Sequence, residues 1–143
     1  MYVYWAANSK TQKISYGVPV ITAFTYSQQG IYPCTYGDGN NYAKPSITIS
    51  VTNTTWYEYT SGSTSGNTAV AGSYAGLTFT KVTSYNNITS ASDATVDGTT
   101  GWVGFANSGG GTNNVNSRTC WVKATVYNAS DSSKTASSTA AAT

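Results

Sequence analysis

The stretch Ser46-Ile-Thr-Ile-Ser-Val-Thr52 alternates apolar side chains with hydroxyl side chains. A period of two is the pattern of a β-strand with one buried face and one solvated face. The apolar face of this strand would consist of Ile47, Ile49 and Val51. We expect the extended chain to continue through Trp56 to Tyr59, because aromatic residues favour strands. The stretch therefore predicts β-structure.

A second alternating segment lies near the C-terminus, at Arg118-Thr-Cys-Trp-Val-Lys-Ala-Thr-Val-Tyr-Asn128. Its inward residues would be Cys120, Val122, Ala124 and Val126. Similar but shorter runs predict strands at Val20–Tyr26, Ile31–Tyr36, Leu77–Thr83, Trp102–Phe105 and Lys134–Thr139. Residues 86–97 are polar and predict a loop with a short strand. Clusters of Gly, Ser and Asn predict turns or loops at Gly37–Asn41, Ser61–Gly66 and Ser108–Asn114.

Short strands separated by frequent turns are typical of an all-β fold. We predict an antiparallel β-sandwich of seven to nine strands, immunoglobulin-like in the first instance, with a Greek-key jelly roll as the alternative. A chain of 143 residues is long enough for one such domain. Residues 18–143 would form the sandwich, and residues 1–17 would be an N-terminal arm or a first strand.

The composition argues against catalysis. The chain has no His, and its five acidic residues are scattered. General acid–base catalysis needs a side chain poised near neutral pH, and His is the usual one. A glycosidase would need a matched pair of carboxylates, and none occurs at a suggestive spacing. We therefore predict a protein that is not an enzyme, with no cofactor and no metal site.

Charged residues make up only 8% of the chain, against about 25% in typical soluble domains. The seven basic residues never form a run, whereas a nucleic-acid binder needs a dense basic track. No segment approaches the ~20 apolar residues of a membrane span, and the N-terminus lacks the features of a signal peptide. We expect no nucleic-acid partner and no membrane span. Met1 is either native or added to a cloned fragment.

Two cysteines, Cys34 and Cys120, could form a disulfide or remain as two buried thiols. Without His they do not complete a zinc site.

Aromatic residues supply the candidate contact sites. The cluster Tyr2, Tyr4 and Trp5 could dock on a partner, because Tyr and Trp are enriched at interface hot spots. The alternative is a first strand. Exposed indoles could instead stack on sugar rings, and the candidates are Trp102 and Trp121, with Trp5 and Trp56 also considered. The competing interpretation is that these indoles fill the core or cover sheet edges.

Several segments resemble one family. They are Pro19–Tyr26, Pro45–Val51 with its Trp56-Tyr57 continuation, Val122–Tyr127 and the Ser- and Ala-rich tail Asn128–Thr143. Together these segments resemble the immunoglobulin-like domains of surface-exposed proteins from gut Bacteroidales and their phages, including virion proteins of crAss-like phages. The resemblance spans roughly residues 18–143 and implies a sandwich that decorates a surface. It transfers no catalytic residue.

The chain departs from the immunoglobulin pattern of Cys, Trp and Cys with a Tyr two places before the second Cys. Arg118 stands at that place, and Cys34 and Cys120 are widely spaced. An inter-sheet disulfide packed on Trp56 is thus only partly supported by the pattern.

Two functions follow as expectations. The first is a phage virion structural protein on the particle surface, a capsid decoration or a head-fibre or tail accessory, whose partners are capsid or other virion proteins and further copies of itself. The second is an adhesin or glycan-binding module of a bacterial cell surface, or an extracellular one. A host-surface glycan is the further partner that we consider.

Overall fold

The structure is a computed structural model that describes residues 10–27, 43–60, 63–105 and 119–143. Strands make up most of these residues, and no helix occurs among them, so the prediction of an all-β fold is confirmed. The strands are β1 (Lys10–Ser15), β2 (Val20–Tyr26), β3 (Pro45–Ser50), β4 (Thr52–Tyr59), β5 (Thr64–Ala71), β6 (Tyr74–Val82), β7 (Ser84–Tyr85), β8 (Ile88–Thr89), β9 (Ala94–Val96), β10 (Val103–Phe105), β11 (Cys120–Asn128) and β12 (Asp131–Ala142). The described part of the chain contains no helix with the length and apolarity of a membrane span.

The described residues contain twelve strands, against the seven to nine predicted, and eight of the twelve have six residues or more. The other four, β7 to β10, have two or three residues each. All strand pairings among the described residues are antiparallel. The sheet orders are β1-β4-β5, β12-β11-β6, β2-β3, β10-β9 and β7-β8.

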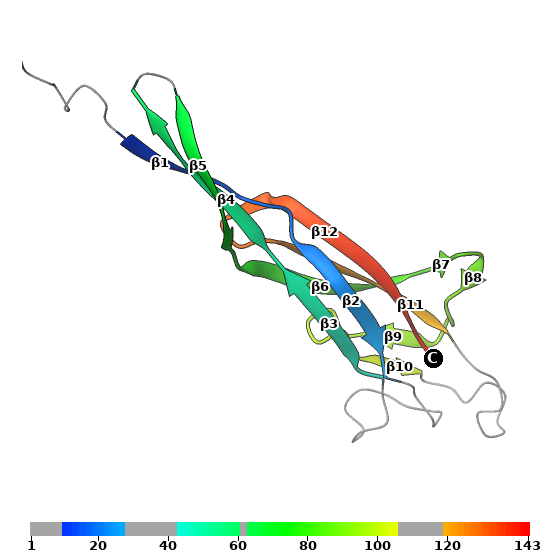
Figure 1. The fold of residues 1–143 in the computed structure, drawn as a ribbon. Coiled ribbons are helices and arrows are strands. Elements are labelled where there is room, and N and C mark those ends of the chain that lie inside the picture. The colour runs from blue at the N-terminus through cyan, green and yellow to red at the C-terminus, as the bar shows by residue number, and fades with distance from the viewer. Residues whose placement is uncertain (1–9, 28–42, 61–62, 106–118) are drawn as a thin grey trace, which may run out of the picture.

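The molecule is elongated (Figure 1). Sheets β12-β11-β6 and β2-β3 form its body, with β2 beside β12, and β9 and β10 lie at one end of that body. At the other end the sheet β1-β4-β5 projects away from the body. We call it the projecting sheet. The body is consistent with a β-sandwich, and its immunoglobulin-like topology stays a prediction.

The core lies in the body and is built by apolar residues of several sheets. Phe24 of β2 and Phe79 of β6 bring their ring centroids within 6.0 Å of each other, which joins two of the sheets. The buried residues of the core cluster are Ala43, Phe79, Ala94, Val103, Phe105, Cys120, Val122, Ala124 and Ala142. The Tyr26 hydroxyl donates a 2.7 Å hydrogen bond to the carbonyl of Gly101, and burial raises the pKa of this phenol.

Strand β11 confirms its predicted faces. Its residues alternate between buried and less buried positions, starting with the buried Cys120. The predicted run at residues 46–59 is also extended, but it changes sheets at Val51. This residue is buried, and its carbonyl accepts a 2.8 Å hydrogen bond from the Gly72 amide. As a result β3 pairs with β2 in the body, whereas β4 belongs to the projecting sheet.

The prediction of a loop at Ser61–Gly66 is wrong from Thr64 onward, because β5 begins there. Every residue of β5 is exposed, so the strand has no apolar face. The alternation that reveals a half-buried strand is therefore missing from its sequence. The final strand, β12, is also longer than predicted at both ends.

A small polar cluster joins the projecting sheet to the body. Asn128, which is 1% exposed, donates 2.9 Å hydrogen bonds to the carbonyl of Gly17 and to Oδ1 of Asn53. That Oδ1 also accepts a 3.1 Å hydrogen bond from the Gly17 amide. A Cβ atom at Gly17 would collide with the carbonyl oxygen of Thr52, so only glycine permits this close crossing. The cluster fixes the chain where it passes between the two parts.

Three predicted segments lie outside the described residues: the strand at Ile31–Tyr36, the turn at Gly37–Asn41 and the loop at Ser108–Asn114. The division into an arm of residues 1–17 and a domain of residues 18–143 stays a prediction. Strand β1, inside the predicted arm, pairs with β4 along its whole length.

Candidate functional site

The projecting sheet is unusual because neither of its faces is covered. Every residue of β1 and β5 is exposed, and no residue of β4 is buried. Among its apolar residues, Ile14 is 47% exposed and Val70 is 43% exposed. A sheet normally gains stability by burying one apolar face. The two uncovered faces of the projecting sheet are therefore the candidate binding surfaces.

The strand register assigns residues to the two faces. Trp56 lies opposite Lys13, and Thr54 lies opposite Ser15, so these four share one face, which we call the groove face. The opposite face, which we call the tyrosine face, carries Ile14, Tyr57, Tyr59 and Val70. On it the Lys10 ammonium lies 3.9 Å from the centroid of the Tyr57 ring, a cation–π contact.

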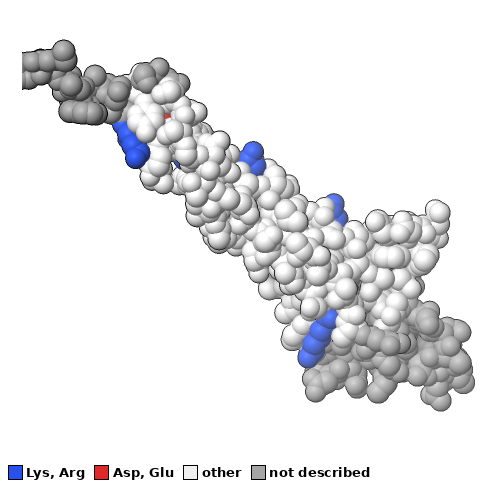
Figure 2. All heavy atoms as spheres, in the orientation of Figure 1, with Lys and Arg blue, Asp and Glu red and all other residues white. Residues whose placement is uncertain are grey.

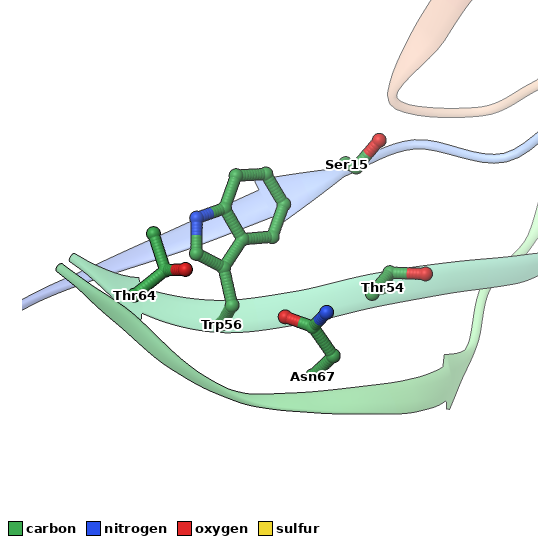
Figure 3. A pocket seen from close by; sticks show the side chains of 5 residues that line it. All are labelled: Ser15, Thr54, Trp56, Thr64 and Asn67. Atoms are coloured by element: carbon green, nitrogen blue, oxygen red, sulfur yellow. The ribbon is translucent and has the colours of Figure 1, made fainter.

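A β-bulge lies opposite Trp56. Thr55 pairs with Thr68 and Tyr57 pairs with Ser65, which leaves Gly66 and Asn67 facing the single residue Trp56. Gly66 has a φ of 72°, a left-handed conformation that glycine adopts without strain. Bulges of this kind redirect a side chain. Here the bulge places the Asn67 amide beside the Trp56 indole (Figure 3).

The groove face is hollowed around this indole. Ser15, Thr54, Trp56, Thr64 and Asn67 line an open pocket of about 410 Å³, which we call the Trp56 groove. The indole stands away from β4, with hydroxyl and amide groups around it (Figure 3). The walls of the Trp56 groove thus combine one aromatic surface with several uncharged polar groups.

Charge is sparse at the groove. Lys13 and Glu58 form an ion pair with 3.7 Å between Nζ and Oε2, and both side chains are about half exposed. The basic residues elsewhere are scattered, and Figure 2 shows no continuous basic patch on the face it displays. The groove is therefore close to neutral, which favours uncharged polar ligands over nucleic acid or other polyanions.

Two carboxylates of the body, those of Asp97 and Asp131, make hydrogen bonds within turns. Asp97 accepts hydrogen bonds of 2.8 Å from the Thr100 amide and 2.9 Å from the Thr99 amide, and these bonds hold its pKa below the usual value. Asp131 similarly accepts hydrogen bonds from Ser133, which lower its pKa. In the parts of the chain that the structure describes, no group of three or more His, Cys, Asp or Glu is placed to hold a metal ion.

The indoles predicted to stack on sugars lie in the body. Trp121 packs its ring against Tyr85 with 4.9 Å between centroids, and its Nε1 is buried with no hydrogen-bond partner among the described residues. Trp102 is partly buried, with the Lys44 ammonium 5.7 Å from its ring centroid. Both remain candidates, but neither lines the Trp56 groove.

Of the remaining predicted site residues, the structure describes only Cys120. Tyr2, Tyr4, Trp5 and Cys34 lie outside the described residues. Cys120 is a buried thiol, and burial raises its pKa to about 11. The disulfide between the two cysteines therefore stays a prediction.

Sequence reasoning weighed Trp56 among the indoles but missed the groove. The missing information was the register of β5, because Gly66 and Asn67 matter only as the bulge opposite Trp56. A Gly-Asn pair in a Ser- and Thr-rich stretch otherwise indicates a turn.

Comparisons of the chain with protein-family models, with curated proteins and with solved structures found no match.

Proposed function

We propose that the chain is a non-catalytic structural protein of a virion surface, a capsid decoration or a head-fibre or tail accessory, and that its projecting sheet is the element that makes contact with a second copy. The observation that carries the proposal is the lack of any buried residue in that sheet.

Physical reasoning supports a contact role for this element. A small sheet needs an apolar face packed against something to be stable in water. The tyrosine face offers Ile14 and Val70, both more than 40% exposed, together with Tyr57 and Tyr59. Its outer strands, β1 and β5, are also the edges of this sheet among the described residues, and edge strands offer backbone groups for pairing. A second copy can cover both the face and an edge, since the same surface is present on it.

The virion setting is supported by the shape and the surface. An elongated β-structure carries the proposed contact element at one end and the short strands β9 and β10 at the other (Figure 1). Charged residues are only 8% of the chain, so hydroxyl and amide groups must supply most of the polar surface. Such a surface suits a protein that is displayed on a particle.

Two measurements test this function. Light scattering of the pure protein reports the number of copies, and co-sedimentation with phage heads that lack their decoration reports attachment. Self-association together with co-sedimentation supports the proposal. A protein that stays monomeric and remains in the supernatant contradicts it.

The second candidate function is a bacterial adhesin or glycan-binding module on a cell surface or outside the cell. The Trp56 groove favours this candidate, because an aromatic ring among hydroxyl and amide groups is suited to a carbohydrate. The two functions use opposite faces of the projecting sheet and are compatible in one molecule.

A further inference from the structure

We propose that the Trp56 groove binds a neutral saccharide, with one pyranose ring stacked on the indole of Trp56 and its hydroxyl groups bonded to the side chains around it. The inference rests on the second candidate function and gives it a site. It is independent of the virion role, because it concerns the groove face rather than the tyrosine face.

Within the part of the chain that the structure describes, the polar side chains of the groove have no hydrogen-bond partner. In the described residues, none of the side chains of Ser15, Thr54, Thr64 and Asn67 makes a hydrogen bond. Each hydroxyl offers one donor and two acceptor sites, and the amide offers both kinds. A sugar hydroxyl likewise donates and accepts. The groove therefore presents a convergent set of groups that match a polyol.

The indole supplies the second half of the recognition. Trp56 is partly exposed and forms the one aromatic surface of the groove. A pyranose ring carries C–H groups on one face and hydroxyls at its rim, so the ring can lie on an aromatic surface while its rim reaches the polar walls. Trp is suited to such a contact because it combines a large apolar area with a polar edge.

The electrostatics select against charged ligands. Lys13 lies directly opposite Trp56 in the strand register, but its ammonium is paired with Glu58 at 3.7 Å. An anionic ligand would have to compete with this carboxylate, and a cationic one with the lysine. A neutral ligand leaves the pair undisturbed.

The size and the preformed shape of the groove also suit the binding of a small saccharide. A volume of about 410 Å³ lies within the range of about 300–1,000 Å³ that small-molecule sites occupy. Gly66 is part of the bulge that places Asn67 beside the indole, so this arrangement is present before a ligand arrives (Figure 3). Preformed groups bind with a smaller entropic cost. The openness of the groove points to weak binding of the kind that repeated copies strengthen.

Nuclear magnetic resonance titration of the full chain tests the proposal. Lactose, cellobiose and maltose are added at millimolar concentrations while the indole N–H signals are followed, with the Trp56 signal assigned by its loss in Trp56→Ala. We expect a saturable shift of that signal with at least one sugar. Asn67→Ala and Thr54→Val are expected to weaken binding about tenfold. The matched control is Tyr74→Ala, which removes an exposed aromatic side chain of β6 and should leave binding unchanged.

The possible outcomes separate the proposal from its rivals. Because Asn67→Ala and Thr54→Val keep the indole, they remain informative if Trp56→Ala disturbs the sheet. A shift of the Trp102 or Trp121 signal in place of Trp56 assigns binding to the body and overturns the proposal. A Trp56 signal that responds only to protein concentration makes the groove a self-association surface. No response to any of the three sugars in the folded protein also overturns the proposal, whatever the light-scattering result.

Discussion

Asn128 is the residue on which the link between the projecting sheet and the body depends. It is almost fully buried and bonds both Gly17 and Asn53. Asn128→Ala leaves these buried polar groups without their donor, so we expect the free energy of unfolding to fall by about 1–3 kcal/mol. Urea denaturation measures the loss. The exposed Ser132, in the same hairpin, gives the control Ser132→Ala, and an equal loss in both variants would refute the role of the cluster.

Lys81 shows why an inward-facing charge is tolerated in β6. The sequence places it on the same face as Leu77 and Phe79, and its ammonium donates hydrogen bonds of 2.6 Å to the Ala91 carbonyl and 2.9 Å to the Ala94 carbonyl. Hydrogen bonds that involve a charged group contribute about 1.5–3 kcal/mol.

Lys81→Met keeps most of the aliphatic stem but removes these bonds. We expect lower stability and faster amide exchange in residues 91–96. The control is Lys123→Met, at an exposed position of the neighbouring strand β11. Unchanged exchange in the Lys81 variant would show that the lysine does not hold this segment.

Because the thiol of Cys120 is buried, the free energy of unfolding should depend on pH in the alkaline range. Burial raises the pKa of its thiol from 9.0 to about 11, which means that the folded state favours the protonated form. The resulting stabilisation is complete below the pKa of the unfolded thiol and is lost as the pH rises towards about 11.

Under reducing conditions, the free energy of unfolding should therefore decline between pH 9.0 and about 11. The decline should be smaller in Cys120→Ala, and Tyr26, whose pKa is also raised, accounts for part of what remains. Denaturation curves across this pH range provide the measurement. Identical pH dependence in the two proteins would argue against a buried thiol.

At the scale of single elements, the bulge of β5 is the feature that shapes the groove. Gly66→Ala puts a side chain in a left-handed conformation, which costs about 1 kcal/mol. We expect the variant to remain folded but to shift the Trp56 indole signal, because Asn67 moves. The control is Gly98→Ala, where an added Cβ would meet only an ordinary contact. A Trp56 signal that is the same in the Gly66 variant would mean that the bulge does not position Asn67.

The elements also show what the sequence can reveal. Strand β11 was predictable with its faces because one face is buried, and burial imposes the alternation of Cys120, Val122, Ala124 and Val126. Strand β5 was not predictable, because a strand exposed on both faces carries no such pattern. The change of sheet at Val51 could not be predicted for a related reason. The local pattern of residues specifies an extended chain but does not specify the strands with which it pairs.

The Trp56 groove could not be predicted from the sequence for the same reason, because the pairing of its strands is not visible there. Its residues come from three strands, and only the register of β1, β4 and β5 brings them together. The sequence supplied the aromatic residues and the lack of charge, which indicated binding rather than catalysis. It could not rank Trp56 against Trp102 and Trp121.

At the scale of the whole molecule, stability is distributed unevenly. The body contains the buried core, whereas the projecting sheet has no buried residue. Elements with few buried contacts open most easily. We therefore expect amides of β5 to exchange faster than those of β11 in dilute protein. Their exchange should slow as the protein concentration rises, because a second copy covers the sheet. Exchange independent of concentration would be contrary to this expectation.

The central claim is that the projecting sheet is a contact element for a second copy, and light scattering across a range of protein concentrations tests it most directly. The account predicts a mass above the 15.0 kDa of one chain, and a return to one chain in the double variant Ile14→Lys and Val70→Lys, which places charge on the tyrosine face. The same pair of changes at exposed positions of the body, Thr78→Lys and Thr80→Lys, should leave the assembly intact. A wild-type protein that stays at 15.0 kDa at every concentration would contradict the claim.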